Sequence, residues 1–124
     1  MNAPVDISES PRVKIADQQL VEAGLGRLSA NSDRAWALDA GYIYLLERAV
    51  RLGWEIPKDA EHPVAEAWNI ALAGLNLTQS EFDTSCRLLE HLRDRYVRPR
   101  EATRDDVSAA IVWAWRIRAA VIEG

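Results

Sequence analysis

Apolar residues recur along the chain at spacings of three and four, which is the period of an amphipathic helix. The clearest example is a stripe made of Ala35, Leu38, Tyr42, Leu45, Ala49 and Leu52. We find no convincing run in which apolar and polar residues alternate, as they do in a half-buried strand. The pattern therefore predicts an all-α protein.

Residues that favour helix ends set the limits of the first two predicted helices. The first is expected from Val13 to Leu28, with an end weakened by two glycines, each costing about 1 kcal/mol relative to alanine. The second begins at a cap formed by Asn31 or Ser32. It ends before Gly53, because glycine adopts the left-handed conformation that closes many helices.

Three more helices are predicted by the same kind of signal. Pro63 is placed at the first position of the third helix, where no amide donor is needed. Thr78 and Glu81 form a capping box for the fourth, and Thr103 with Asp106 begins a fifth that runs to the C-terminus. The residues of the fourth helix expected to face the core are Phe82, Cys86, Leu89, Leu92 and Tyr96.

Short connections between these helices favour antiparallel neighbours and hence a compact bundle of about five helices. The length of 124 residues suits one domain with a core of its own. Residues Met1 to Arg12 contain two prolines and few apolar side chains, so we expect a mobile tail there. The single helical domain is therefore predicted over residues 13–124.

Composition narrows the class of protein without naming its function. Cys86 is the one cysteine, which excludes an intramolecular disulfide. The N-terminus lacks the basic start and apolar run of a signal peptide, and no apolar stretch is long enough to cross a membrane. We therefore expect a cytoplasmic protein that does not associate with membranes.

The charge is −4 overall and is unevenly distributed. Residues 1–86 carry 7 basic and 13 acidic groups, whereas residues 87–100 carry 5 arginines and 2 acids. Arginines beside an aromatic residue suit an acidic protein surface or a phosphate backbone. We therefore place Arg95, Arg98 and Arg100 among the candidate partner-binding residues. The alternative is that this cluster only balances the acids elsewhere and caps the fourth helix.

Asp39 lies within the apolar arc of the second helix, where an unpaired carboxylate would be costly. Arg93 and Arg118 occupy similar positions on the fourth and fifth helices. The sequence therefore predicts a structural buried ion pair between Asp39 and one of these arginines. The alternative is that Asp39 reaches solvent at the end of the bundle.

The sequence presents no catalytic or metal site that we would defend. Glu90 and Asp94 share a helix face, but arginines lie within one turn of them, as on a solvated, charge-laced surface. Cys86 and His91 are five residues apart, about 140° around a helix, and cannot converge on one metal ion. Motifs for phosphate binding or nucleophilic catalysis are absent. We expect no cofactor and no enzymatic activity.

Five tryptophans accompany a single phenylalanine, and tryptophan is enriched at the centres of protein interfaces. Trp36 and Trp68 have apolar neighbours on their own helices and are expected in the core. Trp54 and Trp115 are expected at the surface. The alternative is that all five tryptophans fill the core of a small domain.

The fifth helix has almost no polar face. Trp113 and Trp115, two positions apart, point to nearly opposite sides of it. One flank of small and branched residues suits close packing: Ala110, Ala114, Ile117 and Val121. Trp115 and Ile122 lie on the other side and are candidate partner-binding residues.

These features predict a non-catalytic helical protein, of bacterial or phage type, that binds another protein. Inhibitors, immunity proteins or antitoxins, and assembly chaperones fit this description, as does a homodimer formed through the fifth helix. The first alternative is a nucleic-acid-binding subunit that uses the arginine cluster at 93–100. The second is a small helical enzyme with a cleft between helices. An open pocket lined by Asp39 and an arginine would favour the enzyme, and a filled core the binding protein.

Overall fold

We describe a computed structural model of the chain over residues 6–55, 63–94 and 101–123, without the side chains of residues 63–66 and 92–94. The helices are η1 (Ile7–Glu9), α1 (Pro11–Gly24), α2 (Ala30–Arg51), α3 (Pro63–Leu72), α4 (Gln79–Asp94) and α5 (Arg104–Glu123). Over these ranges there is no strand, so the predicted all-α class is confirmed. None of the described helices is long and apolar enough to cross a membrane.

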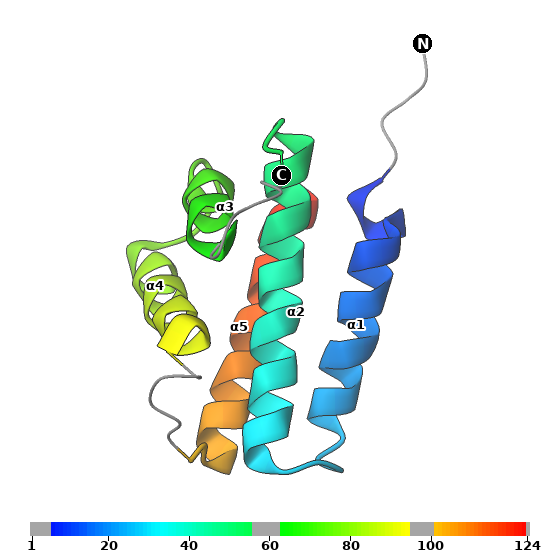
Figure 1. The fold of residues 1–124 in the computed structure, drawn as a ribbon, viewed down its shortest axis with the longest axis vertical. Helices are drawn as coiled ribbons and strands as arrows, with labels where there is room; N and C mark the ends of the chain where they lie inside the picture. Colours follow the sequence, from blue (N-terminus) through cyan, green and yellow to red (C-terminus); the bar gives the residue numbers. More distant parts are fainter. Residues whose placement is uncertain (1–5, 56–62, 95–100, 124) are drawn as a thin grey trace.

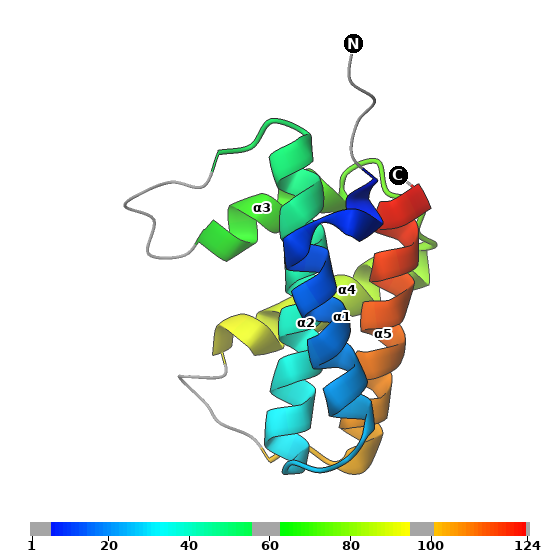
Figure 2. The same cartoon turned by 90° about the vertical axis from the view of Figure 1, so that its right-hand side faces the viewer.

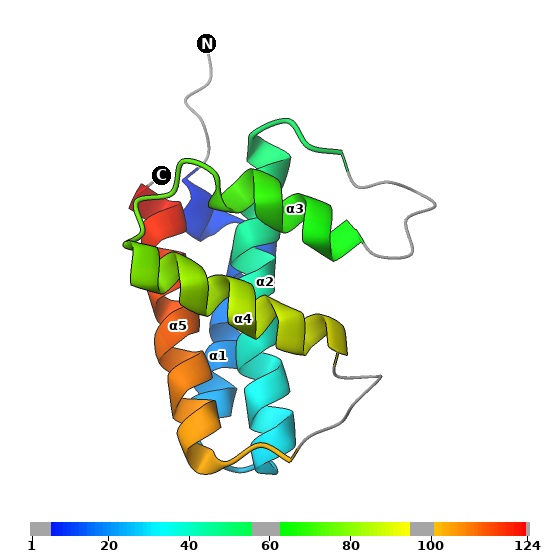
Figure 3. The same ribbon diagram turned by 90° about the vertical axis from the view of Figure 1, so that its left-hand side faces the viewer.

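Helices α1, α2 and α5 lie side by side and form the body of the bundle (Figures 1 and 2). On one face of this body, α3 crosses α2, and α4 crosses both α2 and α5 (Figure 3). Because α2 contacts α1, α3, α4 and α5, it is the central element of the packing. The largest fully buried apolar side chains are Tyr44, Leu20, Leu45, Ile117 and Val13.

The predicted helix ends agree closely with the structure where a local cap defines them. Thr78 and Glu81 exchange side-chain to backbone hydrogen bonds at the start of α4, at 2.9 and 3.1 Å. The same exchange joins Thr103 and Asp106 before α5. Gly53 has the predicted left-handed conformation, with φ of 99°. Helix α2 begins earlier than expected, because the hydroxyl of Ser29, and not Asn31 or Ser32, caps it.

The N-terminal boundary differs from the prediction. Helix α1 begins at Pro11 and ends at Gly24, four residues before the expected end, and Gly26 then turns the chain with φ of 67°. Within the expected tail, residues 7–9 form η1, which contacts α1 and α5, and Ser10 is buried. A proline at the first helical position extends α1 into the region expected to be mobile.

The small-residue flank of α5 packs as predicted. Ala110, Ala114, Ile117 and Val121 are all buried. Trp113 is also buried, and its ring lies directly against Gly41 of α2. A Cβ atom at position 41 would overlap that ring. The absence of a side chain at Gly41 therefore allows α2 and the indole of α5 to approach each other.

A hydrogen-bonded group centred on Asp17 joins helices α1, α2 and α5. The carboxylate of Asp17 in α1 accepts a 2.6 Å bond from the hydroxyl of Tyr44 in α2. It also accepts bonds of 2.8 and 3.1 Å from Nε and Nη2 of Arg118 in α5. Burial and the bond to Asp17 raise the pKa of the Tyr44 phenol, so the hydroxyl stays protonated as a donor. One carboxylate thus fixes the relative rotation of three helices.

Replacing Gly41 by alanine is expected to destabilise the protein by about 1–3 kcal/mol, because the added methyl group overpacks the contact with Trp113. Gly24→Ala is the matched control, since a Cβ atom there meets nothing within 4 Å. That control should be neutral or stabilising by about 0.5–1 kcal/mol. Urea denaturation measures both changes. A Gly41→Ala variant as stable as the wild type would contradict the close contact.

Removing the shared carboxylate with Asp17→Ala is expected to cost about 2 kcal/mol, because it leaves a buried hydroxyl without an acceptor. Tyr44→Phe should then cost less in the Asp17→Ala background than in the wild type. A double-mutant cycle by urea denaturation measures this coupling, which we expect at about 1 kcal/mol. Simple addition of the two losses would show that the bond carries no stability.

Candidate partner-binding site

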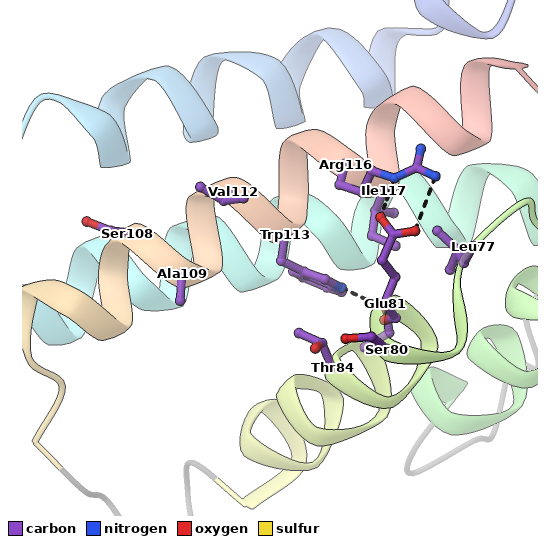
Figure 4. A pocket seen from close by; sticks show the side chains of 11 residues that line it. Leu77, Ser80, Glu81, Thr84, Ser108, Ala109, Val112, Trp113, Arg116 and Ile117 are labelled. Carbon is purple, nitrogen blue, oxygen red and sulfur yellow. Dashed lines mark hydrogen bonds and ion pairs between the residues drawn. The ribbon is translucent and has the colours of Figure 1, made fainter.

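An open groove of about 410 Å³ lies between α4 and α5 (Figure 4). Its surface is mainly apolar, with small side chains on both walls and larger ones on the floor. Ala109 and Trp113 point from α5 toward α4, where Ser80 and Thr84 lie opposite. The lining residues are Leu77, Ser80, Glu81, Thr84, Ser85, Ser108, Ala109, Val112, Trp113, Arg116 and Ile117. We call this the α4–α5 groove.

The main polar groups of the groove bond to one another. Nε1 of Trp113 donates to the hydroxyl of Ser85 at 2.9 Å, and that hydroxyl donates to the carbonyl of Glu81 at 2.8 Å. The Arg116 guanidinium forms an ion pair with the Glu81 carboxylate and donates to the carbonyl of Asn76 at 2.9 Å. These bonds attach α4 to α5 at one end of the groove.

The ion pair keeps both of its members charged. Hydrogen bonds from Arg116, and then from the backbone N–H of Thr78, lower the pKa of the Glu81 carboxyl from 4.5 to about 2. The bond to Glu81 raises the pKa of Arg116. A general acid or base works best when its pKa lies near the pH of the reaction. This pair is poorly suited to proton transfer at neutral pH.

The outward side of α5 continues the apolar surface beyond the groove. Val112, on the groove's rim, is 69% exposed, and Trp115 is 40% exposed. Ile111 and Ile122 are half-buried on the same side. The guanidinium of Arg118 lies over the Trp115 ring at 5.9 Å, within the range of a cation–π contact. We call this set of four apolar residues the α5 outer face.

The structure separates the tryptophans differently from the prediction. Trp115 is exposed as expected, and Trp68 is buried with its ring edge-on to Tyr42. The prediction that Trp54 lies at the surface is wrong, because only 9% of this residue is exposed. The left-handed turn at Gly53 reverses the chain, and the Trp54 amide bonds back to Ala49, so the indole joins the core.

Trp36, expected in the core, is 38% exposed. It lines a second pocket, of about 400 Å³, between α1 and α2. The other residues around that pocket are Ile15, Gln18, Gln19, Glu22 and Leu28. Four of these residues belong to α1, so Trp36 lies beside that helix and not beneath it.

The inward face of α4 is rotated from the predicted one. Phe82 is 40% exposed and Cys86 is exposed, whereas Ser85, Leu88 and Leu89 are buried. The cause is tertiary, since the Trp113 indole hydrogen-bonds Ser85 and draws that side of α4 toward α5. Of the other predicted core residues of this helix, Leu92 and Tyr96 lie outside the described side chains.

Arg118 takes Asp17 as its ion-pair partner, in place of the predicted Asp39. The physical reason is that position 118 of α5 faces α1, which neither the length nor the period of the helices revealed. Asp39 is half-buried on α2 and lines neither of the two pockets described above. The side chain of Arg93 lies outside the described part of the chain, so its pairing with Asp39 stays a prediction.

Arg95, Arg98 and Arg100 also lie outside the described residues, and their predicted role in binding is untested. Among the residues that the structure does describe, no group of three His, Cys, Asp or Glu side chains is placed to hold a metal ion. The α4–α5 groove was not anticipated. Its sequence signal is a set of small residues on two helices, and that signal does not reveal that the two sets face each other.

Comparisons with protein families, with curated proteins and with solved structures each found no match to this chain.

The low pKa of Glu81 predicts how acid affects stability. Its ionised form is favoured in the folded state, so its contribution is complete above pH 4.5 and is lost as the pH falls toward 2. Glu81→Gln keeps a capping side chain and should lose less stability than the wild type between pH 6 and pH 2. Arg116→Met should reduce the pH dependence in the same way. The midpoint of urea denaturation, measured at several pH values in this range, reports the loss of stability. If Glu81→Gln loses as much stability in acid as the wild type, the ion pair is contradicted.

Proposed function

We propose that this protein is non-catalytic and acts by binding another protein through the α5 outer face and the adjoining α4–α5 groove. The observation that carries the proposal is the continuity of the two surfaces at Val112. This residue lines the groove and, among the described residues, is also the most exposed of the large apolar side chains. Contiguous apolar surface of this kind is typical of interaction sites.

The composition of the surface supports a protein partner. Trp115 provides a large, rigid contact area, and its ring is held against Arg118, which is itself anchored to Asp17. Tryptophan and arginine are the residues most enriched in interface hot spots. A side chain already held in place loses little freedom when a partner binds.

The chemistry of the groove gives less support to an enzyme. Glu81 and Arg116 are the ionisable residues that line it, and they form an ion pair with each other. The pKa of the Glu81 carboxyl is lowered to about 2, so this group is not suited to proton transfer at neutral pH. The carboxylate expected for an enzymatic cleft, Asp39, does not line the groove. The nucleic-acid alternative depends on arginines outside the described residues and therefore gains no support.

Within this class, the kinds of protein that we propose are an inhibitor, an immunity protein or antitoxin, or an assembly chaperone, of bacterial or phage type. A second copy of this chain is the other protein partner to consider, since the α5 outer face is also where a homodimer would form. The net charge of −4 favours a partner with a basic surface.

The proposal predicts that Val112→Asp and Trp115→Ala each reduce capture of the native protein partner, because both changes remove exposed apolar contact area. Ile15→Asp is the matched control, an equivalent substitution on α1 at a residue that is 54% exposed. The full tagged chain is used to capture partners from the cells that produce it, followed by mass spectrometry. Light scattering of the purified chain detects self-association.

Changes at these exposed positions should leave folding within about 0.5 kcal/mol of the wild type, which thermal unfolding checks. Loss of the same partner in all three variants would point to a non-specific effect of the substitutions. Capture that is unaffected by Val112→Asp and Trp115→Ala, or recovery of nucleic acid in place of a protein, would overturn the proposal.

A further inference from the structure

Resting on the proposed function, we propose that the occupant of the α4–α5 groove is an amphipathic helix of the partner protein, with an aliphatic face and a positively charged polar face. The proposal joins three properties of the groove: its shape, its continuity with exposed Val112, and the charges around it. Each is a property of residues that the structure describes.

The shape of the groove suits side chains that project from a helix. Small residues line both walls, with Ser80 and Thr84 one turn apart on α4 and Ser108 and Ala109 on α5. The floor is the buried indole of Trp113. Helix-in-groove binding places apolar side chains at spacings of three and four into such a channel. The volume of about 410 Å³ accepts several aliphatic side chains together.

The apolar surface extends further than a small molecule in the groove would cover. Val112 on the rim and Trp115 one turn beyond it would stay in water beside such a ligand. A helix that lies over the groove covers Val112 as well, and its neighbouring residues reach the α5 outer face. Continuity of the apolar surface therefore favours a segment of a protein.

The charges around the groove indicate which charge the contacting surface of the partner carries. Within the groove, Glu81 and Arg116 neutralise each other. On α5, the exposed acids Asp105 and Glu123 share a helix face with the lining residues Ala109, Val112 and Arg116, one toward each end of the groove. Asp105 lies one turn from Ala109, and the charge of Glu123 contributes to the raised pKa of Arg116. On α4, the exposed Arg87 donates to the hydroxyl of Thr84 at 3.3 Å. An apolar channel with an acid toward each end of one wall is complementary to a cationic amphipathic helix.

Two synthetic amphipathic helices test this inference. Both carry the same leucine face, and the polar face is lysine in one and glutamate in the other. Binding to the full chain is measured by calorimetry in low and physiological salt. We expect the lysine peptide to bind at least about tenfold more tightly than the glutamate peptide, with an affinity that falls as salt is added.

Matched variants locate the binding site. Ala109→Leu fills the groove and should weaken binding of the lysine peptide about tenfold, whereas Gln18→Leu adds a leucine at an exposed position of α1, away from both the groove and the α5 outer face. The double variant Asp105→Asn, Glu123→Gln should weaken binding of the lysine peptide severalfold. The control with the same change in net charge is Glu9→Gln with Glu22→Gln on the N-terminal elements. Thermal unfolding confirms that each variant folds.

The outcomes separate this inference from the proposed function. Binding of the lysine peptide that depends on Ala109 and on the two edge acids, but not on the control positions, supports it. Equal binding of both peptides overturns the charge preference. A dimer that Ala109→Leu dissociates assigns the groove to a second copy and also overturns the inference. If neither peptide binds while Val112→Asp still abolishes capture of the native partner, the cationic helix is wrong and the proposed function stands.

Discussion

The contact between Gly41 and Trp113 is the constraint on which the arrangement of α2, α4 and α5 depends. Because position 41 has no side chain, the six-membered ring of the indole lies directly against α2 and remains buried. Its Nε1 then reaches across to Ser85, which fixes the rotation of α4. The same ring forms the floor of the α4–α5 groove. One close approach thus determines core packing and the candidate binding surface together.

The outer face of α5 stays uncovered because α2 packs on its inner side, while α4 and α1 lie on its two flanks. Arg116 pairs with Glu81 of α4, and Arg118 pairs with Asp17 of α1. Residues two positions apart point about 200° away from each other on a helix, so the two ion pairs hold α4 and α1 apart. Trp115, between them in sequence, is 40% exposed, and none of the described helices covers its outward side. The apolar outer face of α5 is therefore left open by the part of the bundle that the structure describes.

Features decided by local chemistry could be predicted from the sequence, and features decided by helix rotation could not. The Thr78–Glu81 cap and the Gly53 turn involve only near neighbours in the chain. Phe82, in contrast, was expected in the core and is exposed, because a distant contact, the hydrogen bond from Trp113 to Ser85, sets the rotation of α4. For the same reason the sequence could offer Arg118 as one of two candidate cations, but it could not indicate Asp17 as the carboxylate that Arg118 binds. The groove was missed because it requires small residues of α4 and α5 to face each other.

The double use of Glu81 explains why the groove can persist without an occupant. Its carboxylate caps α4 through the amide of Thr78 and also binds Arg116 of α5. The side-chain contact between the two helices is therefore concentrated at one end of the groove, where Ser85 and Trp113 add a second bond. Along the rest of it, small residues leave space that the helices cannot close without breaking these bonds. A site held open in this way binds without first rearranging, so less of its interaction energy is lost to ordering.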